Sequence, residues 1–330
     1  MSYWQGKRTL VTGGAGFIGS HLVEMLLADG ANVRVVDNLE RGRLSNLEQV
    51  LNDIEFIQRD LRDPQVCLQV TQGMECVINM AAKVTGIEYN RFHHGDMFTA
   101  NVLINTNVLE AAHLNDVRRF CAVSTACIYP HDAAVPTPES EGDRGTPEPT
   151  NEGYGWAKRM AEKQARYYAA EYGMEVAIVR PFNAYGPRDY YDRATSHVIP
   201  ALIAKVIDGD DPVVVWGSGN QSRVFVHAED FARGIQLVTE KYPAADPVNV
   251  GHDQETTIKD LLAKIIELTG KEPRVVFDTS LPEGYRRRAA DTTKLRQVTG
   301  GFVPRITLEQ GLAEMIEWYL STHAGARRDS

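Results

Sequence analysis

Residues 12–19, Thr12-Gly13-Gly14-Ala15-Gly16-Phe17-Ile18-Gly19, decide how this chain folds. They follow a short apolar run at 8–12 and precede a helical pattern at 18–29. A glycine-rich turn between a strand and a helix lets backbone amides approach a pyrophosphate at the helix N-terminus. The spacing is G-x-x-G-x-x-G rather than the standard G-x-G-x-x-G. We predict a dinucleotide site here that includes Gly13, Gly16, Phe17, Ile18 and Gly19.

Outward from this loop, strand and helix signals alternate. The sequence predicts strands at 8–12, 32–37, 54–59, 76–81, 119–124 and 175–180, and helices at 18–29, 98–115 and 154–172. Residues 131–153 are rich in Pro, Glu, Thr and Gly and predict a loop. This alternation is typical of a parallel sheet with helices on both faces, the doubly wound Rossmann-type α/β fold.

Beyond residue 181 the pattern is less regular and predicts a smaller C-terminal lobe. Its predicted elements are helices at 198–207, 257–269 and 308–322, a strand at 213–216 and a turn at 217–219. We place a cofactor-binding domain at 1–180 and a second lobe mainly at 181–330, with some segments returning to the first domain. Residues 324–330 are expected to form a frayed tail.

Bulk composition disfavours several classes of partner. The 330 residues carry a net charge of −9 with a pI near 5.5, which argues against a nucleic-acid-binding surface. Residues 1–8 have no apolar signal core, and no apolar run reaches the roughly 18 residues that a membrane span needs. We therefore expect no association with a membrane. The four cysteines have neither metal-ligand nor disulfide-framework spacing, so we also expect no metal and a reducing, cytoplasmic location.

Asp37 ends the second predicted strand, where a carboxylate accepts hydrogen bonds from adenosine ribose hydroxyls. Its charge would repel a 2′-phosphate, which favours NAD over NADP, although Arg41 and Arg43 leave NADP open. Asp60 fits an adenine contact and an ordinary loop carboxylate equally well. The other predicted cofactor contacts are Asn38, Leu61, Ala81, Ala82, Lys83, Asn101, Tyr154, Lys158 and Pro181.

A possible redox set follows the strand at 119–124. Tyr154 and Lys158 stand four residues apart on a predicted helix and therefore share a face, although a solvated helix face would show the same spacing. The ammonium is expected to lower the pKa of Tyr154 and favour its phenolate. Thr125 would hold the same substrate oxygen, and Cys127 lies two residues further on.

Together these residues resemble the extended short-chain dehydrogenases/reductases of the NAD-dependent sugar epimerase/dehydratase family. The resemblance runs from the glycine-rich loop to about Asp291. Within the family, the chain most resembles the GDP-mannose 3,5-epimerases and the GDP-fucose synthases. The more specific segments are 126–130, 148–154, 197–203 and 215–223.

The resemblance implies that Cys127 is an acid or base at sugar carbons next to a ketone. His197 matches the second such group of the synthases, whereas the 3,5-epimerases have a lysine there. Asp37 and the Arg286-x-Arg288 spacing look more like the 3,5-epimerases, and Arg287 matches an arginine of the synthases. Arg223 lies where the family contacts the nucleotide diphosphate. The implied substrate contacts are Thr125, Ala126, Cys127, Asn183, His197, Val198, Trp216, Arg223, Arg286, Arg287 and Arg288.

Each of these residues also has a simpler interpretation. Cys127 would serve as a small apolar filler, His197 as a packing residue at a helix N-terminus, and Arg286 to Arg288 as a solvated basic run. The 4,6-dehydratases of the family carry an Asp-Glu pair where Ala126 and Cys127 stand, so dehydration is disfavoured.

The sequence thus leads us to expect an NAD-dependent nucleotide-sugar epimerase, with a GDP-linked substrate and catalytic residues Thr125, Cys127, Tyr154, Lys158 and His197. Oxidation at C4 acidifies the protons at C3 and C5, and a thiol and an imidazole suit their transfer. The alternatives are a GDP-4-keto-6-deoxy-sugar 3,5-epimerase/4-reductase that consumes NADPH, a plain 4-epimerase and a redox-sensing binding protein. The family also implies a homodimer formed through helices at about 99–115 and 154–172.

Overall fold

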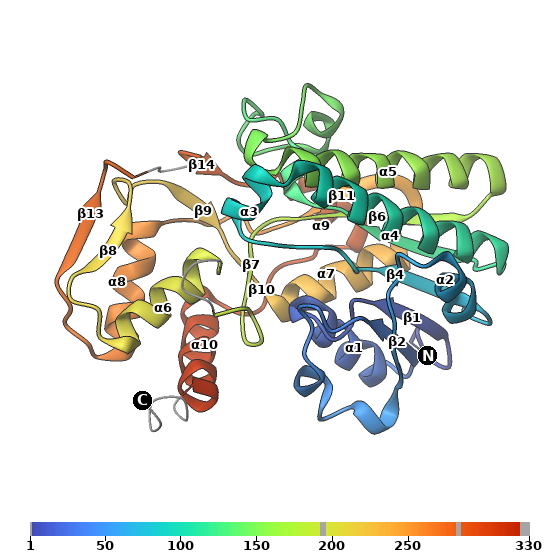
Figure 1. Cartoon of the computed structure of the whole chain (residues 1–330), viewed down its shortest axis with the longest axis horizontal. Coiled ribbons are helices and arrows are strands. Elements are labelled where there is room, and N and C mark those ends of the chain that lie inside the picture. The colour runs from blue at the N-terminus through green and yellow to red at the C-terminus, as the bar shows by residue number, and fades with distance from the viewer. Residues whose placement is uncertain (1, 192–195, 282–284, 324–330) are drawn as a thin grey trace.

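The computed structural model describes residues 2–191, 196–281 and 285–323. The expected tail at 324–330 lies outside these residues. Seven parallel strands form the main sheet in the order β11-β6-β5-β4-β1-β2-β3 (Figure 1). They are β1 (Arg8–Thr12), β2 (Asn32–Asp37), β3 (Glu55–Gln58), β4 (Cys76–Asn79), β5 (Arg119–Val123), β6 (Glu175–Pro181) and β11 (Ala244–Val250). The predicted Rossmann-type parallel sheet is confirmed.

Helices cover both faces of this sheet, as the alternation of the strands requires. In β2, Val33 and Val35 join one apolar core whereas Val36 joins the other, because successive side chains point to opposite faces. One core packs under α1 (Phe17–Ala28), α7 (Ala228–Lys241) and α9 (Thr293–Thr299). The other packs under α2 (Pro64–Thr71), α4 (His94–Leu114) and α5 (Glu152–Tyr172), and the short α3 (Ile87–Phe92) precedes α4.

The second lobe lies beside the carboxyl ends of the main strands (Figure 1). Its core is formed by α6 (Val198–Asp208), α8 (Ile258–Thr269), α10 (Leu308–His323) and the parallel pair β8 (Val213–Trp216) and β13 (Val275–Asp278). Two small sheets complete it. One pairs β7 (Ala184–Tyr185) with β10 (Val226–His227), and the other joins β12 (Glu255–Thr257), β9 (Ser222–Val224) and β14 (Arg287–Arg288).

Local signals explain where the helices begin and end. Asp63 caps α2 by accepting a hydrogen bond from the Gln65 amide at 2.9 Å, with Pro64 in the first turn. α5 ends at Gly173, whose φ of 71° is the left-handed conformation that glycine adopts most readily. The predicted loop at 131–153 contains two 3₁₀ turns, η4 (Glu139–Asp143) and η5 (Pro149–Asn151). Further 3₁₀ turns are η1 (Leu44–Leu47), η2 (Leu51–Asp53) and η3 (Ala126–Ile128).

Two segments beyond residue 181 belong to the main sheet. β11 pairs in parallel with β6, and α7 packs against β6 and α1. These two segments therefore return to the first domain, as expected for part of the chain beyond residue 181. The exact division at this residue stays a prediction.

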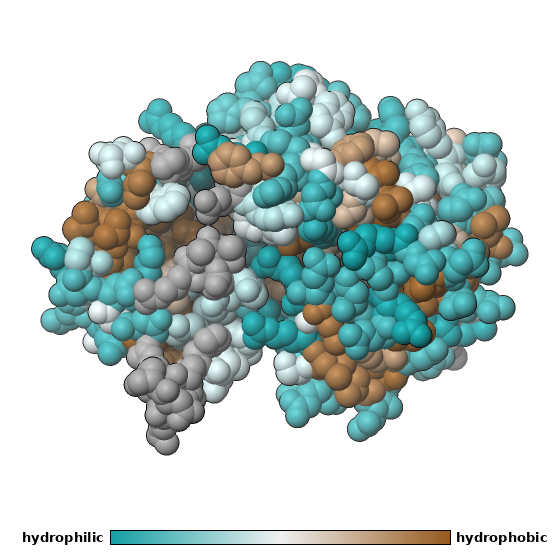
Figure 2. All heavy atoms as spheres, viewed as in Figure 1, coloured by the Kyte–Doolittle hydropathy of each residue, from teal (hydrophilic) through white to brown (hydrophobic). Residues whose placement is uncertain are grey.

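Apolar surface remains over α4 and α5 in the view of Figure 2. The exposed large apolar side chains of these two helices are Leu103, Leu114, Met160, Tyr167 and Tyr172. Among the described residues, no helix is both long and apolar enough to cross a bilayer.

Candidate active site

The glycine-rich loop joins β1 to α1 at the carboxyl edge of the sheet. Gly13 has φ of 68°, and a Cβ there would lie 3.0 Å from the Cα of Ala81 at the end of β4. A Cβ on Gly19 would lie 2.2 Å from the carbonyl oxygen of Gly13. The first glycine therefore permits the turn, and the third lets α1 pack directly on it. No side chain within the described ranges caps the helix at Gly16, so its first amides suit a phosphate.

Asp37 stands beside this loop at the end of β2. Its carboxylate accepts hydrogen bonds from the amide of Ala15 at 3.1 Å and the amide of Leu39 at 2.8 Å. Burial raises its pKa, although these two hydrogen bonds act in the opposite direction. A Cβ on Gly42 would lie 2.8 Å from both carboxylate oxygens. The buried carboxylate and the open backbone beside it fit a ribose-binding position.

The other predicted cofactor residues fall into two groups. Asp60 forms an ion pair with Arg62, and both side chains are exposed, as expected of a surface carboxylate. Asn101 is fully buried, and its amide accepts from Lys83 N at 3.0 Å and donates to Lys83 O at 3.1 Å. Asn101 therefore fixes the backbone that follows β4. Asn38, Leu61, Ala81, Ala82 and Pro181 lie at or just beyond the carboxyl ends of strands, which is the edge that the glycine loop occupies.

Thr125, Tyr154 and Lys158 meet where η3 packs on α5. The Thr125 side chain is close enough to the Tyr154 hydroxyl to lower its pKa, and Lys158 Nζ lies 5.9 Å from the centre of the Tyr154 ring. Lys158 is buried and donates to the carbonyl of Val123 at 2.8 Å. The structure thus brings the three predicted redox residues together.

One expectation about the pKa values of this set is wrong. Burial raises the pKa of Tyr154, and the nearby Cys127 adds to this, whereas the hydrogen bond from Thr125 lowers it. The expected lowering by Lys158 is absent from these interactions, because its ammonium is directed to the end of β5. Burial also lowers the pKa of Lys158 itself to about 8.

Cys127 lies against the second lobe. Its amide donates to the Thr125 hydroxyl at 3.2 Å, and its thiol is the partly exposed one of four free cysteines. Arg288 Nη2 lies 3.8 Å from its Sγ. Burial opposes the arginine cation, but interactions with Cys127, Tyr285 and Glu148 outweigh it and raise the pKa of Arg288.

A glycine makes the close approach of these elements possible. A Cβ on Gly155 would lie 2.8 Å from the Cys127 carbonyl oxygen and 2.5 Å from the Cβ of Pro147. Glu148 caps η5 by accepting from the amide of Thr150 at 3.1 Å, which fixes the start of α5. The segment 148–155 therefore holds Tyr154 next to Cys127.

His197 precedes α6, and 66% of its side-chain surface is exposed. Its Nδ1 lies 3.3 Å from both carboxylate oxygens of Asp189, which is buried. The charge of Asp189 raises the pKa of His197, whereas burial and the charge of Arg41 oppose this. The guanidinium of Arg41 also lies 4.4 Å from the ring centre of Tyr190, so the loop after β2 reaches the segment that holds His197.

The predicted arginines separate into different environments. Arg223 and Arg288 are register neighbours on β9 and β14, and Arg223 donates to the carbonyl of Tyr285 at 2.7 Å. Arg287 points away and forms an ion pair with Glu255, while Arg286 is exposed. The structure therefore places Arg288, and not Arg287, at Cys127.

The remaining predicted substrate residues lie around the same lobe. Asn183 donates to the carbonyl of Val224 at 3.0 Å, so its amide braces the backbone beside β9. Ala126 is buried and Trp216 is 56% exposed, while Val198 begins α6 directly after His197.

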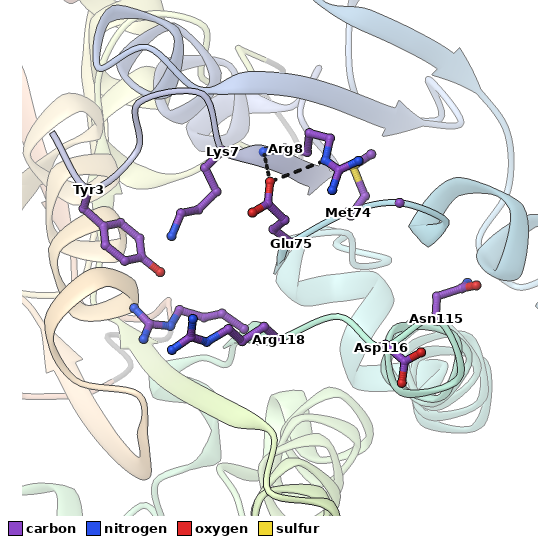
Figure 3. Close-up of a pocket in the computed structure, with 10 residues that line it drawn as sticks. Tyr3, Lys7, Arg8, Met74, Glu75, Asn115, Asp116 and Arg118 are labelled. Atoms are coloured by element: carbon purple, nitrogen blue, oxygen red, sulfur yellow. Dashed lines mark hydrogen bonds and ion pairs between the residues drawn. The ribbon is translucent and has the colours of Figure 1, made fainter. Parts of the chain in front are cut away.

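A cavity of about 370 Å³ lies at the opposite, amino ends of the strands (Figure 3). Lys7, Arg8, Glu75 and Arg118 line it. Arg8 pairs with Glu75, and Arg118 and its neighbour Arg119 both pair with Glu175, so most of the charge here is compensated. None of the predicted catalytic residues lines it.

Sequence reasoning missed Asp189, Tyr285 and Glu148. Asp189 lies eight positions before His197 within an irregular segment, and a carboxylate in a loop carries no signal of its own. Glu148 and Tyr285 lie close in sequence to residues that the family resemblance singled out. The sequence pattern did not show that both would interact with Arg288.

A family model described as "NAD dependent epimerase/dehydratase family" matches residues 9–251. The GDP-L-fucose synthase of Escherichia coli (strain K12) is 39% identical over 263 residues, covering 76% of this chain and 81% of that protein. GDP-mannose 3,5-epimerase 1 of Oryza sativa subsp. japonica is 31% identical over 323 residues, covering 96% and 83%.

Among solved structures, a UDP-glucose 4-epimerase from Thermotoga maritima with UDP-glucose superposes with a TM-score of 0.86. It is 29% identical to this chain, and the match covers 96% of this chain and 99% of that one. The structural match agrees with the observed fold, and the matches that cover 96% of the chain include the second lobe.

Proposed function

Because the chain belongs to the NAD-dependent epimerase/dehydratase family of nucleotide-sugar enzymes, we propose that it epimerises a GDP-linked hexose at C3 and/or C5. The reaction passes through a transient ketone at C4 and ends with that carbon reduced again. The observation that carries the proposal is the thiol of Cys127, which lies beside the Thr125–Tyr154 pair and within 3.8 Å of the Arg288 guanidinium.

The redox half of the reaction belongs to Thr125, Tyr154 and Lys158. Tyr154 removes the proton of the C4 hydroxyl, and Thr125 holds the same oxygen. Lys158 is buried 5.9 Å from the centre of the Tyr154 ring, and we assign it to the same redox set. A nicotinamide cofactor held beside these residues would supply the hydride acceptor and donor for C4.

The glycine loop and Asp37 would hold that cofactor. The close backbone approach at Gly13 and Gly19 suits a pyrophosphate, and the buried carboxylate of Asp37 suits unmodified ribose hydroxyls. We therefore propose NAD, because a 2′-phosphate would meet the charge of Asp37.

The epimerising half belongs to Cys127 and His197. A ketone at C4 stabilises the enolate that forms when a proton leaves C3 or C5. One of the two groups removes this proton, and the other returns a proton to the opposite face. The guanidinium of Arg288 contacts the thiol of Cys127, and the carboxylate of Asp189 contacts the imidazole of His197.

A second candidate is the 3,5-epimerase/4-reductase of a GDP-4-keto-6-deoxy sugar. His197, which matches the histidine of GDP-fucose synthases, favours it, as does the 39% identity to the E. coli enzyme of that name. Proton transfer would use the same residues, but the substrate would already carry its ketone and one reduced cofactor would be consumed for each product.

Cofactor balance separates the two candidates. We expect GDP-mannose to be epimerised with no net consumption or production of reduced cofactor. If only GDP-4-keto-6-deoxymannose reacts, with one reduced cofactor oxidised per product, the second candidate replaces the first. Absence of turnover with both substrates, in protein that binds the cofactor, would refute both.

A further inference from the structure

We propose that Asp189 is a positioning residue that fixes His197 in the tautomer with Nδ1 protonated and leaves Nε2 to exchange a proton with the sugar. The proposal rests on the proposed function for the identity of the proton acceptor. The pairing itself rests on the structure, because Nδ1 of His197 lies 3.3 Å from both carboxylate oxygens of Asp189.

The carboxylate of Asp189 is held rigidly. It belongs to the segment after β7, its side chain is 3% exposed, and its Oδ1 accepts a hydrogen bond from the amide of Tyr190 at 2.7 Å. The amide of Asp189 donates to the carbonyl of Gly186 at 3.4 Å, which closes the turn that carries it. A buried carboxylate is costly unless it is paired, and His197 is the titratable partner that the structure gives it.

The contrast in exposure between Asp189 and His197 indicates how the imidazole ring is oriented. Asp189 is buried, whereas His197 is 66% exposed, so the imidazole turns Nδ1 to the interior and leaves the rest of the ring accessible. A neutral imidazole has one donor nitrogen and one acceptor nitrogen. Since a carboxylate only accepts, Asp189 selects Nδ1–H and makes Nε2 the acceptor.

The proton balance follows from this tautomer. As a base, Nε2 takes a proton from the carbon next to the ketone, which leaves an enolate and an imidazolium that donates from Nδ1 to Asp189. As an acid, the imidazolium returns the Nε2 proton to the enolate carbon and becomes the neutral Nδ1–H form. Asp189 keeps its charge throughout and stabilises the imidazolium in either direction.

Other charged and titratable groups surround the pair. Arg41, from the loop after β2, opposes the imidazolium by its charge. Tyr191 lies near Asp189 on the same segment. Its pKa is raised mainly by burial and, to a smaller extent, by the carboxylate of Asp189. Neither group supplies the negative charge that His197 faces, so removal of the Asp189 charge should act on His197 directly.

Nitrogen-15 NMR of the histidine rings tests the pairing in the whole protein, with His197→Gln identifying the signal among nine histidines. We expect neutral His197 in the wild type to carry its proton on Nδ1. In Asp189→Asn, we expect its titration midpoint to fall by about one pH unit or more and the tautomer to become mixed. Asp211→Asn, an exposed carboxylate that pairs with Arg274, serves as the matched control and should change neither.

A wild-type His197 with its neutral proton on Nε2 would overturn the proposal, and this result needs no variant to fold. An unchanged titration in Asp189→Asn would overturn it as well. A purely structural role predicts altered stability with an unchanged tautomer.

The pH profile of deuterium exchange into the sugar tests the catalytic consequence. The part of the pH–rate profile that is set by the titration of His197 should move to lower pH in Asp189→Asn. The reason is that the lost carboxylate charge no longer favours the imidazolium. If the wild type exchanges and this part of the profile does not move, the proposal fails. If no GDP sugar takes up deuterium with the wild type, the proposed function fails. The NMR result then still tests the pairing of Asp189 with His197.

Discussion

The guanidinium of Arg288 lies 3.8 Å from the thiol of Cys127, although 161 positions separate the two residues in the sequence. The contact arises because β14 pairs with β9, which carries Arg288 to the loop after β5. The thiol that we assign to proton transfer therefore has a guanidinium donor in direct contact.

Arg288→Gln should slow alkylation of Cys127 by iodoacetamide, because the variant removes the guanidinium that lies 3.8 Å from the thiol sulfur. Deuterium exchange at the sugar should slow as well. Arg287→Gln is the matched control, since the neighbouring arginine pairs with Glu255 and should leave the alkylation rate unchanged. Equal rates in the wild type and Arg288→Gln would show that the guanidinium does not act on the thiol.

The burial of Lys158 predicts a pH-dependent stability difference. Its pKa is about 8 in the folded protein and 10.5 when unperturbed, so from pH 8 to 10.5 the unfolded chain binds more protons. The free energy of unfolding should therefore rise with pH in this window, relative to Lys158→Met, by roughly 3 kcal/mol in total. Urea unfolding of both proteins at several pH values measures this. A constant difference between the two would contradict the lowered pKa.

Asp37→Ser should relax the discrimination against a 2′-phosphate. We expect the ratio of NADPH to NADH dissociation constants to fall at least about tenfold, because the repulsion between the carboxylate and the phosphate disappears. Glu40→Gln, on the same loop and more exposed, is the control for a general charge effect. Calorimetric titration with both cofactors checks this, and an unchanged ratio would exclude Asp37 as the determinant.

The sequence was most informative where structure is local. The strands of the first half and the helices α1, α4 and α5 were predicted with bounds close to those observed, because the glycine loop and the apolar periodicities are short-range signals. The short helices α2 and α3 were not predicted. β11 was missed because Asp246 and Pro247 interrupt its pattern, and it is tolerated at the edge of the sheet, where it pairs only with β6. The two-residue strands β7, β10 and β14 are too short to leave a pattern.

For the site, sequence patterns predict the residue types but not their partners. The Thr125–Tyr154 contact follows from a motif, whereas Arg288 at Cys127 and Asp189 at His197 depend on how the second lobe folds back. The effect of Lys158 on Tyr154 was predicted wrongly because spacing on a helix does not report burial, and burial dominates both pKa values.

The exposed apolar side chains of α4 and α5 support a homodimer formed through these helices. Leu103, Met160 and Tyr167 are 42%, 47% and 59% exposed, and a solvated helix pair would gain stability by burying them. The double variant Leu103→Lys, Tyr167→Glu should halve the mass measured by light scattering. Leu320→Lys on α10, with a comparably exposed leucine, should not. A monomeric wild type would refute this interface.

Deuterium exchange with Cys127→Ser tests the central claim most directly. The wild type and the variant are incubated with GDP-mannose in deuterated water, the sugar is analysed by proton NMR, and reduction of the bound nicotinamide is followed by absorbance. We predict that the wild type incorporates deuterium at C3, C5 or both, and that Cys127→Ser incorporates none while still reducing the cofactor. Full incorporation by Cys127→Ser would contradict a proton-transfer role for this thiol.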